Sequence, residues 1–143
     1  LDAQIKSAMA DRRPAQFVIR QAGDVQFAEV VINGPEADSE VIFDYIEGTG
    51  VYAEPQPLTA GATNQGLRIL RARADATALR LTVEGLGGHS YTVNVRTPKR
   101  VGEAKGVTIS QTGDLYARLT IQFTGPADAY VRRELVLPLT ARR

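Results

Sequence analysis

The stretch LRLTVEGLGGHSYTVNVR, residues 79–96, determines the predicted fold. Apolar and polar residues alternate on both sides of a glycine-rich turn. The apolar positions are Leu79, Leu81, Val83, Tyr91, Val93 and Val95. Because successive side chains on a strand point to opposite faces, each half of the stretch buries one face and leaves the other in water. The stretch therefore predicts an antiparallel hairpin.

The same alternation of apolar and polar residues continues along the chain. Residues 115–123 alternate in the same way, with Leu119 and Ile121 on the apolar face. From residue 15 onward, short apolar or alternating runs are separated by glycine, proline, asparagine and aspartate, which is the pattern of strands and turns. The runs predict strands at residues 16–21, 25–33, 40–46, 51–54, 67–74, 79–84, 90–97, 106–110, 115–123 and 130–139.

These strands and their connections indicate a fold class. Short strands joined by hairpin-length turns are typical of an all-β, antiparallel two-sheet β-sandwich, immunoglobulin-like or jelly-roll-like. The longer connection at residues 55–66 is expected to cross from one sheet to the other, and a linker between two small units is the alternative. Neither half has enough strands to cover a core. Residues 14–143 are therefore expected to form a single domain.

The first 13 residues follow a different period. Their apolar residues recur at the three-to-four spacing of a helix face, and Pro14 would end the helix. These residues are Leu1, Ile5, Ala8 and Met9. A helix this short is marginal in water by itself. Residues 1–13 are expected to form a short helix, interpreted as the tail of a preceding domain. A start at Leu1 without methionine also favours a piece of a larger protein.

Composition limits the chemistry of the chain. Its 143 residues include no cysteine, one histidine, 17 basic and 16 acidic residues. The absence of cysteine removes disulfides and thiolate metal sites, and the balanced charge would attract neither nucleic acid nor an anionic membrane. The longest apolar runs are interrupted by charge, so no membrane insertion is predicted. No cofactor is implied.

The residues that could support catalysis or metal binding are few. Nucleophilic catalysis needs a nucleophile beside a base, but His89 and Ser90 are adjacent on a strand and point to opposite faces. The carboxylates Glu36, Asp38 and Glu40 are expected to be solvated. A calcium site is the weaker alternative for them, because oxygen ligands alternate but the glycine-centred loop is missing. The sequence therefore predicts that the domain is not an enzyme.

Aromatic side chains give the one candidate binding surface. The chain has no tryptophan and five tyrosines. Tyr91 lies on an apolar strand face and is expected in the core, and Tyr45 is expected to pack beside Phe43. The others fall on a polar strand face or near loops, where their rings could stack on sugars. These candidate carbohydrate-binding residues are Tyr52, Tyr116 and Tyr130.

Two segments resemble a known family. GLRIL at residues 66–70 and LRLTVEGLGGHSYTVNVRTP at residues 79–98 are similar to the closing β-sandwich of large bacterial carbohydrate-active enzymes, the glycoside hydrolases, where an LRLTVEG.GG..YTV.V hairpin recurs. The resemblance implies an accessory domain that packs behind a catalytic domain, lacks catalytic residues and belongs to a bacterial, exported protein. No functional residue is carried over.

Three functions are compatible with these observations. The leading hypothesis is a non-catalytic accessory domain that packs against a neighbouring domain of its parent protein, and it predicts an exposed apolar patch. The first alternative is a carbohydrate-binding module, which requires two or more coplanar exposed tyrosines. The second alternative is an adhesin-like or immunoglobulin-like cell-surface spacer, which predicts polar faces all round.

Overall fold

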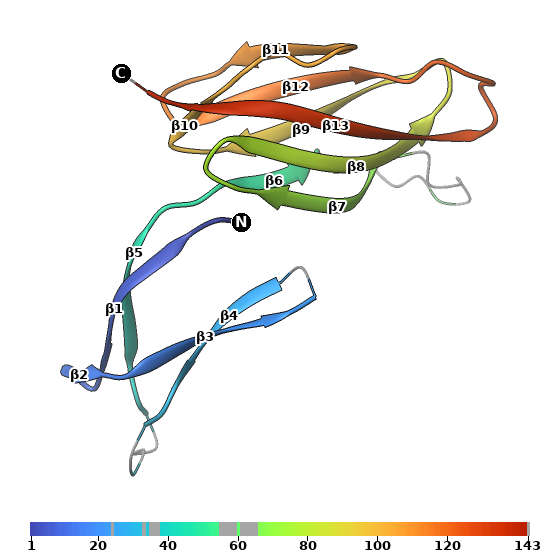
Figure 1. Ribbon diagram of the computed structural model, residues 1–143. Coiled ribbons are helices and arrows are strands. Elements are labelled where there is room, and N and C mark those ends of the chain that lie inside the picture. Colours follow the sequence, from blue (N-terminus) through green and yellow to red (C-terminus); the bar gives the residue numbers. More distant parts are fainter. Residues whose placement is uncertain (24, 33, 35–37, 55–59, 61–65, 143) are drawn as a thin grey trace. The chain divides into compact units, whose positions relative to one another are not determined.

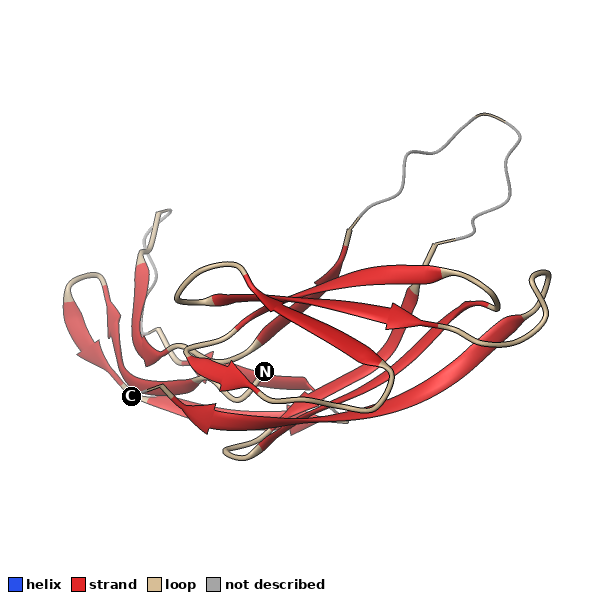
Figure 2. Cartoon of the chain, turned by 90° about the horizontal axis from the view of Figure 1, so that it is seen from above, coloured by secondary structure: helices blue, strands red, loops and turns tan. Residues whose placement is uncertain are grey.

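The computed structural model describes residues 1–23, 25–32, 34, 38–54, 60 and 66–142. Within these ranges the chain is all-β, with antiparallel strands and no helix (Figure 2). The strands are β1 Gln4–Ala10, β2 Arg13–Ala15, β3 Phe17–Ala22, β4 Val25–Val30, β5 Val41–Ile46, β6 Gly50–Ala53, β7 Arg68–Ala74, β8 Ala78–Leu86, β9 Ser90–Arg96, β10 Lys99–Val101, β11 Val107–Gln111, β12 Tyr116–Gln122 and β13 Tyr130–Ala141. The described part has no helix with the length and apolar character that a membrane crossing requires.

The chain divides into two compact units. The larger unit comprises Leu1–Asp2 and Gly48–Arg143, and the smaller unit is Ala3–Glu47. The larger unit contains two four-stranded antiparallel sheets, ordered β10-β13-β8-β7 and β11-β12-β9-β6 (Figure 1). Because β6 and β7 belong to different sheets, the chain changes sheets between them, as predicted. Residues 55–59 and 61–65 of that connection lie outside the described residues.

One hydrophobic core joins the two sheets of the larger unit. The alternating residues of β8, β9 and β12 that were predicted to face inward are buried, and residues of β13, in the same sheet as β8, complete the layer opposite β9 and β12. The fully buried members include Leu79, Val83, Val93, Val95, Leu119, Ile121, Phe123 and Leu137. Burying a side chain of this size contributes about 1.5–3 kcal/mol, so this sandwich-like core stabilises the larger unit.

The helix predicted at residues 1–13 is wrong, because β1 occupies Gln4–Ala10. In the pairing of β1 with β5 the register shifts between Ile5 and Ser7, which leaves Lys6 as an extra, bulged residue. Ile5 lies opposite Tyr45 and Ala8 lies opposite Phe43, so both face the same side of the sheet. A bulge adds one residue to a strand. It therefore produces the three-residue spacing that imitates a helix face.

The smaller unit has two separate pieces of sheet. Strands β2, β1 and β5 form one, and β3 pairs with β4 in a two-stranded hairpin. Among the described residues of this unit, only Ala8 is buried. Tyr45 was expected to pack beside Phe43, but it is 56% exposed. It does share the face of Phe43, which is partly buried, but the Tyr45 side chain itself remains exposed.

A polar cluster holds together the residues that flank the smaller unit. The Thr49 amide donates to Asp2 Oδ1 at 2.7 Å, and Lys99 Nζ donates to Asp2 Oδ2 at 2.7 Å. The hydroxyls of Thr49 and Thr97, both buried, are 3.1 Å apart. Buried polar groups are costly unless they are hydrogen-bonded, so these contacts specify one arrangement. The two chain segments that flank the smaller unit, at Asp2 and Thr49, are therefore held together within the larger unit.

Candidate functional site

The outer face of the sheet β11-β12-β9-β6 carries two of the three tyrosines predicted to bind carbohydrate. Tyr52 on β6 lies opposite Asn94 on β9, which lies opposite Arg118 on β12. In the neighbouring row, Arg96 on β9 lies between Gly50 on β6 and Tyr116 on β12. Alternation of the inner and outer faces points all these side chains away from the core. We call Gly50, Tyr52, Asn94, Arg96, Tyr116 and Arg118 the tyrosine face.

Polar contacts organise this tyrosine face. Tyr52 is 49% exposed and Tyr116 is 41% exposed. Asn94 Nδ2 donates to Glu54 Oε1 at 3.3 Å, and Arg118 Nη2 lies 3.6 Å from the same oxygen. The Arg96 guanidinium lies 6.0 Å from the centre of the Tyr116 ring. Exposed ion pairs contribute about 0–1 kcal/mol, so these contacts orient the side chains more than they stabilise the fold.

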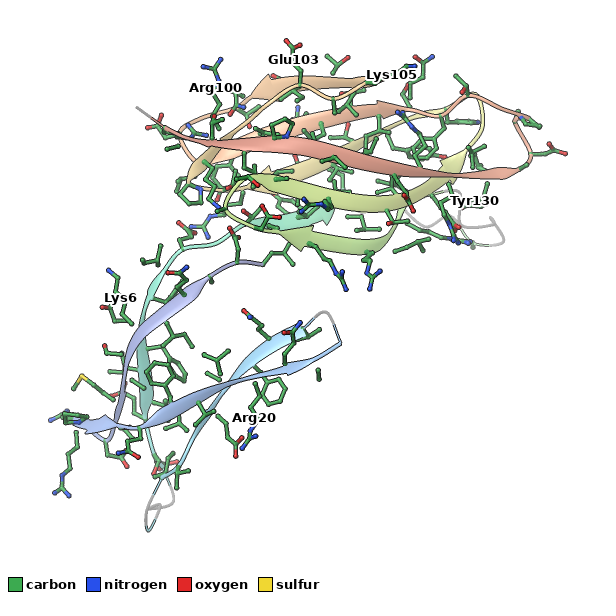
Figure 3. The ribbon with its side chains drawn as sticks, viewed as in Figure 1. Lys6, Arg20, Arg100, Glu103, Lys105 and Tyr130 are labelled. Carbon is green, nitrogen blue, oxygen red and sulfur yellow. The ribbon has the colours of Figure 1, made fainter. Side chains whose placement is uncertain are left out.

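Tyr130 does not belong to the tyrosine face. It begins β13, in the other sheet, and is partly buried (Figure 3). The Arg68 guanidinium lies 4.1 Å from its ring centre, and its hydroxyl donates to the Gly66 carbonyl at 3.4 Å. The structure therefore brings Tyr52 and Tyr116 together and separates Tyr130 from them.

The weak calcium candidates do not form a described site. Asp38 and Glu40 are exposed, and Glu36 lies outside the described residues. The Glu40 amide donates to Asp11 Oδ1, and the Asp11 amide donates to the Glu40 carbonyl, both at 2.9 Å. These bonds tie the β1–β2 turn to the start of β5. Over the part of the chain that the structure describes, no group of three histidine, cysteine, aspartate or glutamate side chains could hold a metal ion.

The histidine and the remaining tyrosine lie at the β8–β9 turn. His89 is exposed, and its amide donates to the Leu86 carbonyl at 3.3 Å. Tyr91 is buried, as predicted, and its hydroxyl accepts a hydrogen bond from the Leu86 amide at 3.2 Å. Its ring meets that of Phe123 edge-on, with ring centres 5.6 Å apart. These contacts attach the β8–β9 turn to the edge of the hydrophobic core.

Asp75, in the turn between β7 and β8, has a shifted pKa. Arg80 Nη1 donates to Asp75 Oδ2 at 2.5 Å, and Oδ1 accepts from the Thr77 amide, the Thr77 hydroxyl and the Ala78 amide at 2.8–2.9 Å. The Arg80 hydrogen bond, followed by these turn donors, lowers the pKa of Asp75 well below its ordinary value. Ionised Asp75 therefore favours the folded β7–β8 turn.

This lowered pKa predicts a pH dependence for Asp75→Asn, which keeps the acceptor Oδ1 but removes the charge. Stability from ionised Asp75 is present above the ordinary pKa of 3.8 and is lost as the pH falls below it. We expect the urea midpoint of the variant to lie below that of the natural chain at about pH 7, and the difference to shrink towards about pH 2. An equal difference at both pH values would contradict this assignment.

The smaller unit carries exposed apolar residues that the sequence predictions did not locate. Its exposed large hydrophobic residues are 36–68% exposed. They are Met9, Val18, Ile19, Val25, Phe27, Val31, Val41, Ile42, Tyr45 and Ile46. The signal was present in FVI at residues 17–19, VVI at residues 30–32 and VIF at residues 41–43, since adjacent apolar residues on a strand lie on opposite faces.

Comparisons with known proteins return no relative for this chain. No family model matches it, and neither a curated protein nor a solved structure does. Proposals about its function therefore rest on the residues themselves.

Proposed function

We propose that this chain is a non-catalytic interaction module whose smaller unit packs against a neighbouring domain of a larger protein. The observation that carries the proposal is the set of exposed apolar residues in Ala3–Glu47. Large exposed apolar areas mark interaction sites, and ten of the fifteen exposed large hydrophobic residues among the described residues lie in this unit. Immunoglobulin-like or jelly-roll-like connectivity and a bacterial, exported parent remain predictions from the sequence and its resemblance.

The β3–β4 hairpin supports this function most directly. Its strands pair only with each other among the described residues. Val18 and Ile19 are adjacent on β3 and are 55% and 46% exposed, so each face of the hairpin carries exposed apolar side chains. A polar cross-strand contact is also present, since Arg20 Nε donates to Glu29 Oε2. An isolated two-stranded hairpin is marginally stable in water, so a partner that covers it would also stabilise it.

Charge indicates what kind of surface the partner presents. Residues 3–47 contain four basic and eight acidic side chains, a net charge of −4, whereas the whole chain is +1. A partner with an apolar centre and a basic rim would complement both properties. A domain in the same polypeptide is favoured over a free protein, because covalent linkage raises its effective concentration.

A polar spacer is less well supported. An adhesin-like or immunoglobulin-like spacer would be expected to present hydrophilic faces. Phe27, Ile42 and Tyr45, at 47%, 47% and 56% exposure, do not fit that expectation.

Hydrogen–deuterium exchange tests the proposed function. The amides of Phe17–Ala22 and Val25–Val30 would be compared in the 143-residue chain and in the parent protein with its flanking sequence. We expect fast exchange in the chain alone and at least about tenfold slower exchange in the parent. Equal exchange in both proteins would overturn the proposal. So would a stable dimer of the chain alone that protects the hairpin, since the occupant would then be a second copy.

A further inference from the structure

We propose that the tyrosine face of the larger unit binds an extended glycan chain. This inference goes beyond the proposed packing function, because it concerns a different unit and a different class of partner. It rests on the spacing of two exposed rings, the polar groups between them and an open position beside them.

The backbone positions that carry the two rings are farther apart than one sugar is long. Tyr52 and Tyr116 are on β6 and β12, with β9 between them, and their pairing rows are offset by two residues. Given the usual strand spacing and rise per residue, their Cα atoms are about 12 Å apart. Both rings stand on the same side of one sheet. This arrangement suits a chain of several sugar units, with one ring of the protein near each end.

Hydrogen-bonding groups fill the space between the two rings. Asn94 and Arg96 both come from β9. Asn94 lies beside Tyr52 on β6, and Arg96 lies beside Tyr116 on β12. Glu54 Oε1 accepts from Asn94 and lies near Arg118, so one carboxylate orients an amide and a guanidinium together. Planar groups with fixed paired donors suit the neighbouring hydroxyls of a sugar. A carboxylated sugar could also use the guanidiniums.

Gly50 has no side chain that would cover the row of Gly50, Arg96 and Tyr116, which lies next to Tyr52. It is not among the glycines with positive φ, and a Cβ added there would come no closer than 3.9 Å to its nearest neighbour, the Arg96 Cβ. Neither backbone conformation nor packing therefore requires glycine at this position. Its lack of a side chain gives a ligand access to Arg96 from the β6 edge.

The composition of the face favours a glycan over a protein partner. Tyr52 and Tyr116 are the large hydrophobic residues that are exposed on it. The core of a protein–protein interface is a contiguous apolar area, which this face lacks. Amphipathic rings separated by amides, guanidiniums and hydroxyls, as in the neighbouring row Thr92 and Thr120, match the alternating apolar and polar surfaces of a sugar chain.

Affinity gel electrophoresis tests this proposal on the 143-residue chain. The gels would contain hydroxyethylcellulose, xylan or polygalacturonate. We expect at least one of these polysaccharides to retard the chain. Retardation by polygalacturonate alone, if salt weakens it, would indicate an acidic glycan. Tyr52→Ala and Tyr116→Ala should each weaken binding by about tenfold or more. Gly50→Gln should also weaken it by covering the open row.

The matched control is Tyr45→Ala, which removes a tyrosine of similar exposure from the smaller unit. It should leave retardation unchanged, and thermal melting should show that all four variants remain folded. Retardation in none of the three gels would overturn the proposal. Equal losses in Tyr45→Ala, or native binding by Tyr52→Ala, Tyr116→Ala or Gly50→Gln, would also overturn it. None of these outcomes bears on the packing of the smaller unit.

Discussion

Gly87→Ala is expected to destabilise the larger unit by about 3 kcal/mol, the upper end of the cost of forcing extra atoms into a packed region. A Cβ at this position would lie 2.3 Å from the Pro126 carbonyl oxygen and 2.6 Å from the Gly125 carbonyl carbon. Both are backbone atoms, so no side chain can rotate away to make room. Chemical denaturation of the natural chain and the variant would measure the loss.

The segment that would have to move is held by hydrogen bonds. The Gly87 amide donates to the Ala129 carbonyl at 3.0 Å, and the Gly88 amide donates to the Phe123 carbonyl at 2.8 Å. Displacing the segment around Gly125 would strain or break these bonds, and a buried hydrogen-bonding group left without a partner costs about 1–3 kcal/mol. This coupling makes Gly87 a point of close contact between the β8–β9 turn and the chain before β13.

Gly88→Ala is the matched control for this prediction. Gly88 has a φ of +75°, and a Cβ added there would meet no atom within 4 Å. Its substitution should therefore cost only the left-handed backbone penalty of about 1–2 kcal/mol. If Gly88→Ala were as destabilising as Gly87→Ala, loss of backbone freedom rather than steric contact would explain both.

The strands of the larger unit could be predicted because their signal is local. In β8, β9 and β12 one residue in two is apolar, and this period specifies both the strand and its buried face. The short strand β10, Lys99–Val101, lacks such a signal because three residues are too few to show a period. The N-terminal strand was mistaken for a helix because the bulge at Lys6 becomes visible only through pairing with β5.

The candidate site was predictable in part. Exposure of Tyr52 and Tyr116 could be expected from their local surroundings. Their convergence could not, because it depends on the pairing of β6 and β12 with opposite edges of β9, and these strands are far apart in sequence. Tyr130 looked equivalent in sequence but lies in the other sheet. The exposure of Tyr45 could not be predicted either, because apolar strand residues predict burial without showing which element buries them.

Phe123→Ala is expected to destabilise the larger unit by about 3–5 kcal/mol, the usual cost of removing a buried phenylalanine. Phe123 is fully buried and packs edge-on against Tyr91. Its ring also lies where a side chain at Gly85 would be, at 2.9 Å from a Cβ built there, so the strand and the ring are closely fitted. We expect loss of the near-ultraviolet signal of the tyrosines and a large drop in the denaturation midpoint.

Phe27→Ala removes the same ring from a place where about half of it is exposed. Phe27 is 47% exposed on β4, so the free energy of unfolding of the isolated chain should change by less than about 1 kcal/mol. In the parent protein the same substitution should speed exchange of the β3 and β4 amides, because the ring would then be lost from an interface. A large loss of stability in the isolated chain would instead assign Phe27 to the folding of the smaller unit. The pair of variants therefore distinguishes apolar residues that hold the module together from those that are available to a neighbouring domain.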